Sequence, residues 1–237
     1  MDEEKPFYEH IDELRSRIIK SLIAVGIFSA LAFYFKDKLL AILTRPVGTK
    51  LIFLSPTEAF GTFITLSIVV GFFAAFPYIL YQVWGFISSM FDKKTRRMAA
   101  LYFISSLLLF YGAIAFCYFL ILPVALQVLG SFSSEVLVSS YTFSSYANFI
   151  MYLLLGFGII FQFPIVMFIL LELNILSVSS FKKKRRLVIV AIFIIAALLP
   201  TIDAFSLVLL ALPMIALFEV TLLVARMRKK AAPAIIS

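Results

Sequence analysis

The strongest constraint on this chain is an uncharged run from Ala59 to Phe91. A helix needs about 20 predominantly apolar residues to cross the roughly 30 Å hydrocarbon core of a bilayer, and this run exceeds that length. The aromatic residues Tyr78, Tyr81 and Trp84 crowd its second half, as is typical near a membrane interface. A basic turn from Asp92 to Arg97 follows at once. The run therefore predicts a transmembrane helix whose second end faces the cytoplasm.

The composition extends this prediction to the whole chain. Hydrophobic residues make up 63% of the sequence and charged residues only 14%, with a mean hydropathy of +1.07. A typical soluble domain has about 25% charged residues, so this chain does not have an ordinary water-facing surface. The net charge of +8 does not indicate nucleic-acid binding, because the basic residues form short clusters between apolar runs. We expect one six-span, all-α integral membrane domain over residues 1–237.

Five further apolar runs complete the set of spans. The predicted spans are Ile18 to Phe35, Ala59 to Phe91, Met98 to Leu122, Tyr146 to Leu173, Leu187 to Leu199 and Ala204 to Ala225. Pro77 is expected to bend the second span, because proline removes a backbone hydrogen bond. The fifth run would form a helix of about 20 Å, short of the bilayer core. The sixth is a second candidate for a short helix.

The segments between and before the spans have their own patterns. Residues 1–17 form a predicted amphipathic N-terminal segment with an apolar stripe through Phe7, Ile11, Leu14 and Ile18. Residues 36–58 are predicted as a loop that contains a short interfacial helix near residues 39–43. Residues from Pro123 to about 145 are predicted as a loop, and residues 226–237 as a cytoplasmic tail.

The distribution of lysine and arginine predicts the orientation. Seventeen of the 21 such residues fall in the N-terminal segment, in the second and fourth connections and in the tail. The other four fall in the first connection. Loops that stay in the cytoplasm carry the excess of basic residues. Both termini are therefore expected on the cytoplasmic side.

Motifs of catalysis are missing from the sequence. There is no Walker A pattern, no Rossmann glycine fingerprint and no G-x-S-x-G elbow, and the single histidine, His10, lies outside the predicted spans. An intramembrane serine protease or zinc enzyme would need a histidine within the bilayer. We expect no enzyme, no metal site and no cofactor. Cys117 is the single cysteine, so an intramolecular disulfide is impossible.

Several polar residues in or near the spans need partners. Gln162 and Asn148 would lie on the same side of an ideal helix, which favours hydrogen bonds to a neighbouring or partner helix. Glu172 and Glu219 lie near the ends of their spans. Pairing with basic neighbours, Glu219 with the cluster at Arg226, is favoured over a proton or ion path.

Two other carboxylates lie outside the spans. Asp203 is predicted to cap the sixth helix through free backbone N–H groups. Glu13 and Arg17 are four residues apart, so a weak salt bridge on a solvated helix face is expected. Glu13 is also the best-placed carboxylate to receive a cationic ligand, because the apolar stripe holds it beside the membrane surface.

Six ordered segments together resemble the TatC family, the polytopic subunit of the twin-arginine protein translocase. The segments are H-I-D-E-L-R-S-R, S-P-T-E-A-F, F-P-Y-I-L-Y-Q-V-W-G-F with the R-R that follows, F-Q-F-P, P-T-I-D-A-F-S and A-L-P-M-I-A-L-F-E. The resemblance covers almost the whole chain and implies six spans with both ends in the cytoplasm. It implies a multi-pass protein of the bacterial cytoplasmic (inner) membrane.

The resemblance implies a receptor for the twin-arginine signal peptides of folded cargo proteins. Its partners would be single-span subunits of the TatA and TatB type, in a homo-oligomeric complex driven by the proton-motive force. The implied signal-peptide site comprises Glu9, Glu13, Arg15, Phe86, Asp92 and Thr95. A carboxylate suits this role, because it accepts two hydrogen bonds from the planar fork of a guanidinium.

Three positions depart from the family pattern. Ser89 stands where a proline usually follows the region of Phe86. Thr95 stands where a glutamate is usual, so the arginine site would depend more heavily on Glu13. Gln162 replaces the usual glutamate of the fourth span, and because it cannot titrate it favours hydrogen bonding with a partner over proton relay. The outer-loop residues that match the family are Pro46, Ser55, Pro56 and Glu58, for which we expect a structural role in turns.

Two other functions remain open from the residues themselves. A small secondary transporter or channel would explain the polar residues in the spans and predicts a central water-filled path. A structural scaffold would need no signal-peptide site. The short fifth span is a hypothetical docking site for a single-span partner, because its mismatch with the bilayer must be relieved.

Overall fold

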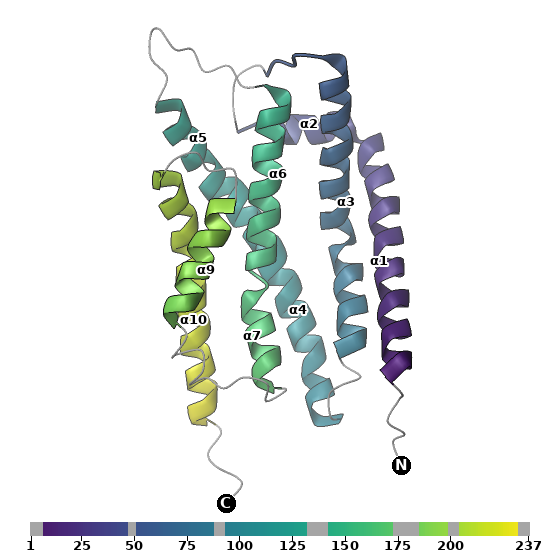
Figure 1. The fold of residues 1–237 in the computed structure, drawn as a ribbon, viewed down its shortest axis with the longest axis vertical. Helices are drawn as coiled ribbons and strands as arrows, with labels where there is room; N and C mark the ends of the chain where they lie inside the picture. Colours follow the sequence, from purple (N-terminus) through teal and green to yellow (C-terminus); the bar gives the residue numbers. More distant parts are fainter. Residues whose placement is uncertain are drawn as a thin grey trace, which may run out of the picture. The chain divides into compact units, whose positions relative to one another are not determined.

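The computed structural model describes residues 7–46, 51–87, 93–131, 142–172, 185–198 and 204–231, and these are almost entirely helical (Figure 1). The helices are α1 (Phe7–Tyr34), α2 (Lys36–Thr44), α3 (Pro56–Ile87), α4 (Lys93–Phe116), a π-helical turn (Cys117–Ile121), α5 (Leu122–Ser131), α6 (Phe143–Ile160), α7 (Phe163–Glu172), α9 (Arg185–Leu198) and α10 (Ala204–Ala231). Within the described residues, extended pairing is limited to a bridge between Ile52 and Thr142. The all-α prediction is confirmed.

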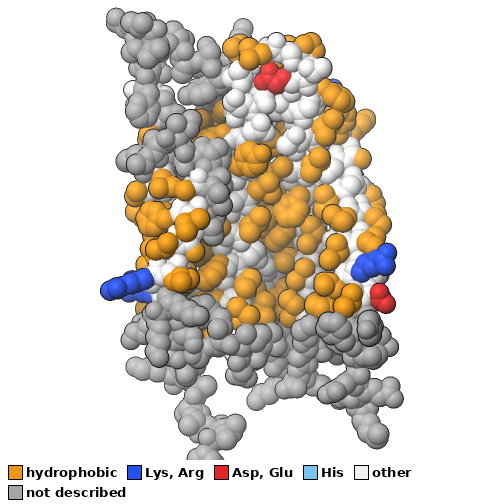
Figure 2. Space-filling view, viewed as in Figure 1, with side chains coloured by type: hydrophobic (Ala, Val, Ile, Leu, Met, Phe, Trp, Pro, Cys, Tyr) orange, Lys and Arg blue, Asp and Glu red, His pale blue; other side chains and the backbone are white. Residues whose placement is uncertain are grey.

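The apolar lengths agree with the predicted spans. Among the described residues, four stretches are long and apolar enough to cross a membrane: Ile11–Tyr34, Pro56–Ile87, Ala100–Val128 and Phe143–Leu171. α9 has 14 residues, or about 21 Å of helix, and α10 carries the shorter apolar stretch Ala211–Ala225. Hydrophobic side chains are spread over the described surface on the face in Figure 2, and few charged side chains lie among them. Such a surface suits lipid.

The chain divides into two compact units. The first comprises residues 1–107 with 140–151, and the second comprises residues 108–139 with 152–237. In the first unit α1 packs along α3, and the buried ring of Trp84 stacks on Tyr102 of α4 at 5.8 Å between centroids. In the second unit Phe110, Phe157 and Phe218 are fully buried. Each unit therefore has its own aromatic core.

Two glycines of α3 allow α1 to approach closely. A Cβ at Gly71 would lie 2.6 Å from the Cα of Ser29, and a Cβ at Gly85 would overlap the guanidinium of Arg17. By contrast, a Cβ at Gly61 of the same helix would meet no neighbouring atom. The contact between α1 and α3 therefore requires the absence of a side chain at Gly71, whereas Gly85 leaves room for the end of the Arg17 side chain.

The predicted boundary at Pro123 is wrong. The structure continues the third span through a π-helical turn into α5, which ends at Ser131. Pro123 is the second residue of α5 and directly follows the π-helical turn, where the N–H of Leu122 donates to the carbonyl of Cys117 five residues earlier. The hydrogen-bond pattern therefore changes just before the residue that has no N–H to donate.

The fourth span is also not a single helix. α6 ends at Ile160 and α7 begins at Phe163, with a turn at Phe161 and Gln162 between them. Pro164 has no N–H to donate to the carbonyl of Ile160, so the regular ladder stops there. The carbonyl of Gln162 instead accepts from the N–H groups of Ile165 and Val166.

Two further predictions concern the first and second spans. The amphipathic segment and the first span form one continuous helix, α1, from Phe7 onward. α3 continues without interruption through Pro77, and the bend there stays a prediction. The short helix expected near residues 39–43 is α2, which lies across the ends of α1 and α3 in Figure 1.

Candidate functional site

The side chain of Arg17 joins α1 to α3 in the first unit. Its Nε and Nη2 donate to Oε1 of Glu13 at 3.0 and 2.6 Å, one helical turn earlier. Its Nη1 reaches the backbone carbonyl of Gln82 at 3.2 Å and the Oε1 atom of that side chain at 3.4 Å. One guanidinium therefore bridges a carboxylate on α1 and two oxygens on α3.

Local structure holds this cluster in place. Glu13 and Arg17 meet because residues four apart lie on one face of a helix. Gly85, one turn after Gln82, leaves room for the guanidinium to lie against α3. The side chains of Arg17 and Glu13 are only 23% and 26% exposed, and Gln82 is buried. A partly buried pair is screened less by salt than an exposed one.

The structure brings only part of the predicted signal-peptide site together. Phe86 follows Gly85 on α3 and is half-buried, whereas Arg15 is exposed on α1. Glu9 and Thr95 lie within α1 and α4, but their side chains fall outside the described ones. Asp92 also lies outside the described residues. Sequence reasoning missed Gln82, whose signal was an amide buried within an apolar helix.

The predicted outer-loop residues form the start of α3. The N–H of Glu58 donates to Ser55 Oγ at 3.1 Å, and Glu58 Oε2 accepts from the N–H of Leu54 at 3.0 Å. This is a capping arrangement of the S-x-x-E type with Pro56 at the first helical position. Pro46 lies in the turn that follows α2. These contacts place Ser55 and Glu58 in the cap of α3.

The two polar residues of the fourth span lie on different segments of it. Asn148 Nδ2 donates to Ser144 Oγ at 3.3 Å within α6. Gln162 lies in the turn after α6, so the ideal continuous helix assumed for these two residues does not exist. The side chain of Glu172 falls outside the described ones, and Asp203 falls outside the described residues.

Glu219 pairs with an arginine that the sequence did not suggest. Its Oε1 lies 2.6 Å from Nε of Arg185, the first residue of α9. α9 packs against α10, which brings the start of α9 beside Glu219. Only the packing of the two helices reveals this pair. The side chain of Arg226, the predicted partner, falls outside the described ones.

Metal-binding clusters are not found in the part of the chain that the structure describes. No group of three or more histidine, cysteine, aspartate or glutamate residues there could hold a metal ion. The described carboxylate of the site, that of Glu13, instead contacts Arg17. The arrangement therefore suits recognition of a cation.

Comparison with known proteins decides the family. Residues 9–213 match the family model described as Sec-independent protein translocase protein (TatC). The chain belongs to the TatC family. Relatives of that name include one from Aquifex aeolicus, 36% identical over 95% of this chain and 97% of its own length. One from Escherichia coli K12 is 34% identical over 95% of this chain and 90% of its own length.

The solved structures of TatC have the same fold. A crystal structure of the twin-arginine translocase receptor TatC superposes with a TM-score of 0.83 at 35% identity, over 92% of this chain and 98% of the other. A second, of the receptor in detergent, gives 0.84 at 34% identity, over 91% and 99% of the two chains. The predicted six-span membrane fold is thereby confirmed. This chain is a multi-pass subunit of the Sec-independent protein translocase, a transport component and not an enzyme.

Proposed function

We propose that this chain is the receptor that binds the twin-arginine signal peptides of folded cargo. The observation that carries the proposal is the fork of Arg17 on Glu13, at 3.0 and 2.6 Å. This carboxylate already has the position and surroundings that bind a guanidinium. An arginine of a signal peptide presents the same group, so it can take the place of Arg17.

Gln82 lowers the free-energy cost of releasing Arg17 from Glu13. When a signal-peptide arginine binds Glu13, Arg17 keeps its contacts to the carbonyl and Oε1 of Gln82. An arginine left without acceptors in a half-buried position would instead lose charge-assisted hydrogen bonds. Phe86, beside this cluster on α3, offers an apolar surface to the hydrophobic part of the peptide. Arg15, Glu9, Asp92 and Thr95 complete the proposed binding face.

The remaining parts of the proposal follow from the charge distribution and the family. The excess of basic residues at both ends and in two connections supports cytoplasmic termini, in a bacterial inner membrane. The solved TatC relatives are described as receptors of the twin-arginine translocase. Single-span subunits of the TatA and TatB type and further copies of this chain are the proposed partners. Gln162 and the short helix α9 are the proposed contact regions for a single-span partner.

A small transporter or channel gains no support from the described contacts. Glu219 pairs with Arg185, and Asn148 bonds within its own helix. Four polar residues suggested a solute path: Asn148, Gln162, Glu172 and Glu219. The contacts above give two of them, Asn148 and Glu219, partners within the chain.

Peptide binding tests the proposal. We would measure the affinity of the purified full chain for a peptide with paired arginines and an apolar tail, against a paired-lysine control. Glu13→Gln should weaken arginine-peptide binding by about 10- to 100-fold, because it removes a charged acceptor worth about 1.5–3 kcal/mol. Asp37→Asn, which removes an exposed carboxylate from α2, should leave binding unchanged. Equal affinity for both peptides, or no effect of Glu13→Gln, would overturn the proposal.

A further inference from the structure

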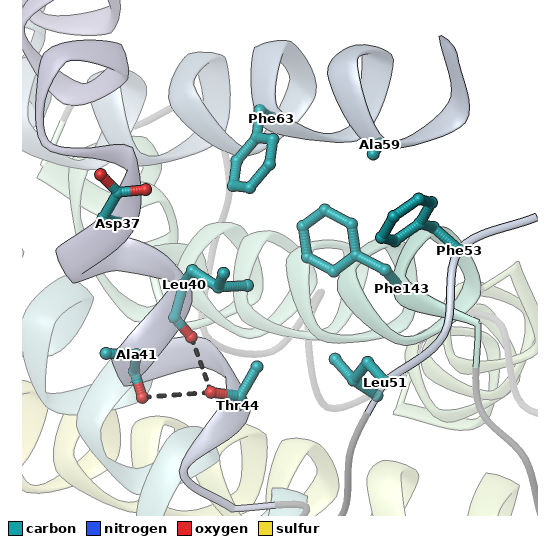
Figure 3. A pocket seen from close by; sticks show the side chains of 9 residues that line it. All are labelled: Asp37, Leu40, Ala41, Thr44, Leu51, Phe53, Ala59, Phe63 and Phe143. Atoms are coloured by element: carbon teal, nitrogen blue, oxygen red, sulfur yellow. Dashed lines mark hydrogen bonds between the residues drawn. The ribbon is translucent and has the colours of Figure 1, made fainter. Parts of the chain in front are cut away.

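The first unit contains a cavity of about 600 Å³ beneath α2 (Figure 3). Its volume lies within the range of small-molecule sites. Its walls come from α2, from the segment before α3, from the first turns of α3 and from the start of α6. The lining residues are Asp37, Leu40, Ala41, Thr44, Leu51, Phe53, Ala59, Phe63 and Phe143.

Contacts between distant parts of the chain build these walls. The hydroxyl of Tyr146 in α6 donates to the carbonyl of Leu43 in α2 at 2.9 Å. The N–H of Phe143 donates to the carbonyl of Ile52 at 2.7 Å. The rings of Phe63 and Phe143 lie 5.1 Å apart. The cavity is therefore a defined feature of the fold, because hydrogen bonds and ring contacts hold each of its sides.

The cavity lies at the level of a membrane interface. α2 starts directly after the apolar stretch Ile11–Tyr34, and Ala59 and Phe63 belong to the first two turns of the stretch Pro56–Ile87. Around the cavity, large apolar side chains are exposed: Ile42 at 58% and Phe53 at 61%. Exposed apolar side chains at the end of a membrane span contact lipid chains and headgroups.

Charges of both signs stand beside the apolar walls. Asp37 lines the cavity and is exposed. Nζ of Lys36 lies 5.7 Å from the centre of the Phe63 ring, which lines the cavity, and 5.8 Å from that of Phe33. These features match a zwitterionic phospholipid. The cation suits its phosphate, the anion suits its ammonium, and the apolar cavity suits an acyl chain.

We propose that this cavity binds an acyl chain of a phospholipid with a primary-amine headgroup, from the leaflet at the end of α1 remote from the N terminus. Leu40, Leu51 and the three phenyl rings contact the chain. Asp37 accepts hydrogen bonds from the ammonium, and Lys36 attracts the phosphate. This site is separate from the Glu13 and Arg17 cluster, because the two lie at opposite ends of α1, so it does not depend on the proposed receptor function.

Native mass spectrometry of the full chain in detergent tests the site. The probes are phosphatidylethanolamine, its N-trimethylated counterpart phosphatidylcholine, and phosphatidylglycerol. We expect one tightly held phosphatidylethanolamine. Ala59→Phe should weaken its binding by about tenfold or more, since the ring excludes two or more methylene groups from the cavity. Ala74→Phe, at an exposed position of the same helix outside the cavity, should not.

Further variants separate the parts of the proposal. Asp37→Asn should remove the preference for phosphatidylethanolamine over the other two lipids and leave acyl-chain binding in place. Ala41→Phe fills the cavity from α2 and replaces Ala59→Phe if that variant does not fold. Unchanged lipid binding in both filled variants would overturn the site. A photo-cross-linker at position 41 should capture lipid, and capture of a second copy or of a partner helix would overturn the proposed occupant.

Discussion

Replacing Arg17 with alanine should loosen α1 from α3. The change removes two contacts to Glu13 within α1 and two to Gln82 across the helices. An i, i+4 ion pair contributes about 0.3–0.5 kcal/mol, and hydrogen bonds from a charged donor contribute about 1.5–3 kcal/mol. Because Arg17 is 23% exposed, we take the lower end and expect a total loss of about 2 kcal/mol.

The single tryptophan provides the readout for this variant. Trp84 lies on α3 two residues after Gln82. It is buried and stacks on Tyr102. Its fluorescence during heating in detergent should show a midpoint lowered by about 4–8 °C, at 2–4 °C per kcal/mol for a chain of this size.

Two further variants show whether the reasoning is right. Arg15→Ala removes an exposed arginine two residues away and should shift the midpoint by less than about 2 °C. Arg17→Lys keeps the charge but loses the planar fork, so most of the loss should persist. Equal shifts for Arg17→Ala and Arg15→Ala would refute a specific bridge between α1 and α3.

Two other predictions concern packing in each unit. Gly71→Ala should destabilise the first unit by about 1–3 kcal/mol, because its methyl group overlaps α1. Gly61→Ala on the same helix should be neutral or stabilising by up to about 1 kcal/mol, and thermal unfolding of the two variants should differ in sign or clearly in size. In the second unit, a double-mutant cycle with Arg185→Gln and Glu219→Gln, measured by thermal unfolding, should give a coupling below about 1 kcal/mol, because these side chains are 53% and 36% exposed. A coupling well above about 1 kcal/mol would contradict a weak ion pair.

How well the sequence predicts a structural feature depends on how far apart in the chain the interacting residues lie. Hydrophobic periodicity and run length report which segments form helices, and they predicted α3, the short α9 and the interfacial α2. Proline was harder to interpret. Pro77 lies inside a continuous helix, Pro123 lies in the first turn of α5, and Pro164 coincides with a break. The effect of a proline depends on whether neighbouring backbone groups find other partners, and the residue type alone does not specify this.

The candidate site shows the same division. The pair of Glu13 and Arg17 could be predicted from a spacing of four residues, since one helix brings these side chains together. The contact from Arg17 to Gln82 joins residues 65 positions apart, and no local pattern predicts it. The family resemblance pointed to Glu13 and Phe86, but it gave no role to Gln82.

The sequence by itself determined that this protein lies in a lipid membrane and not in water, that it is helical, and the order of its spans. These properties depend on apolar run lengths, and each run carries its own information. Only the tertiary structure decided that Arg185 meets Glu219 and that a cavity opens beneath α2. Each of these depends on side chains from separate helices, so it exists only after α9 has packed on α10, or after α2, α3 and α6 have come together.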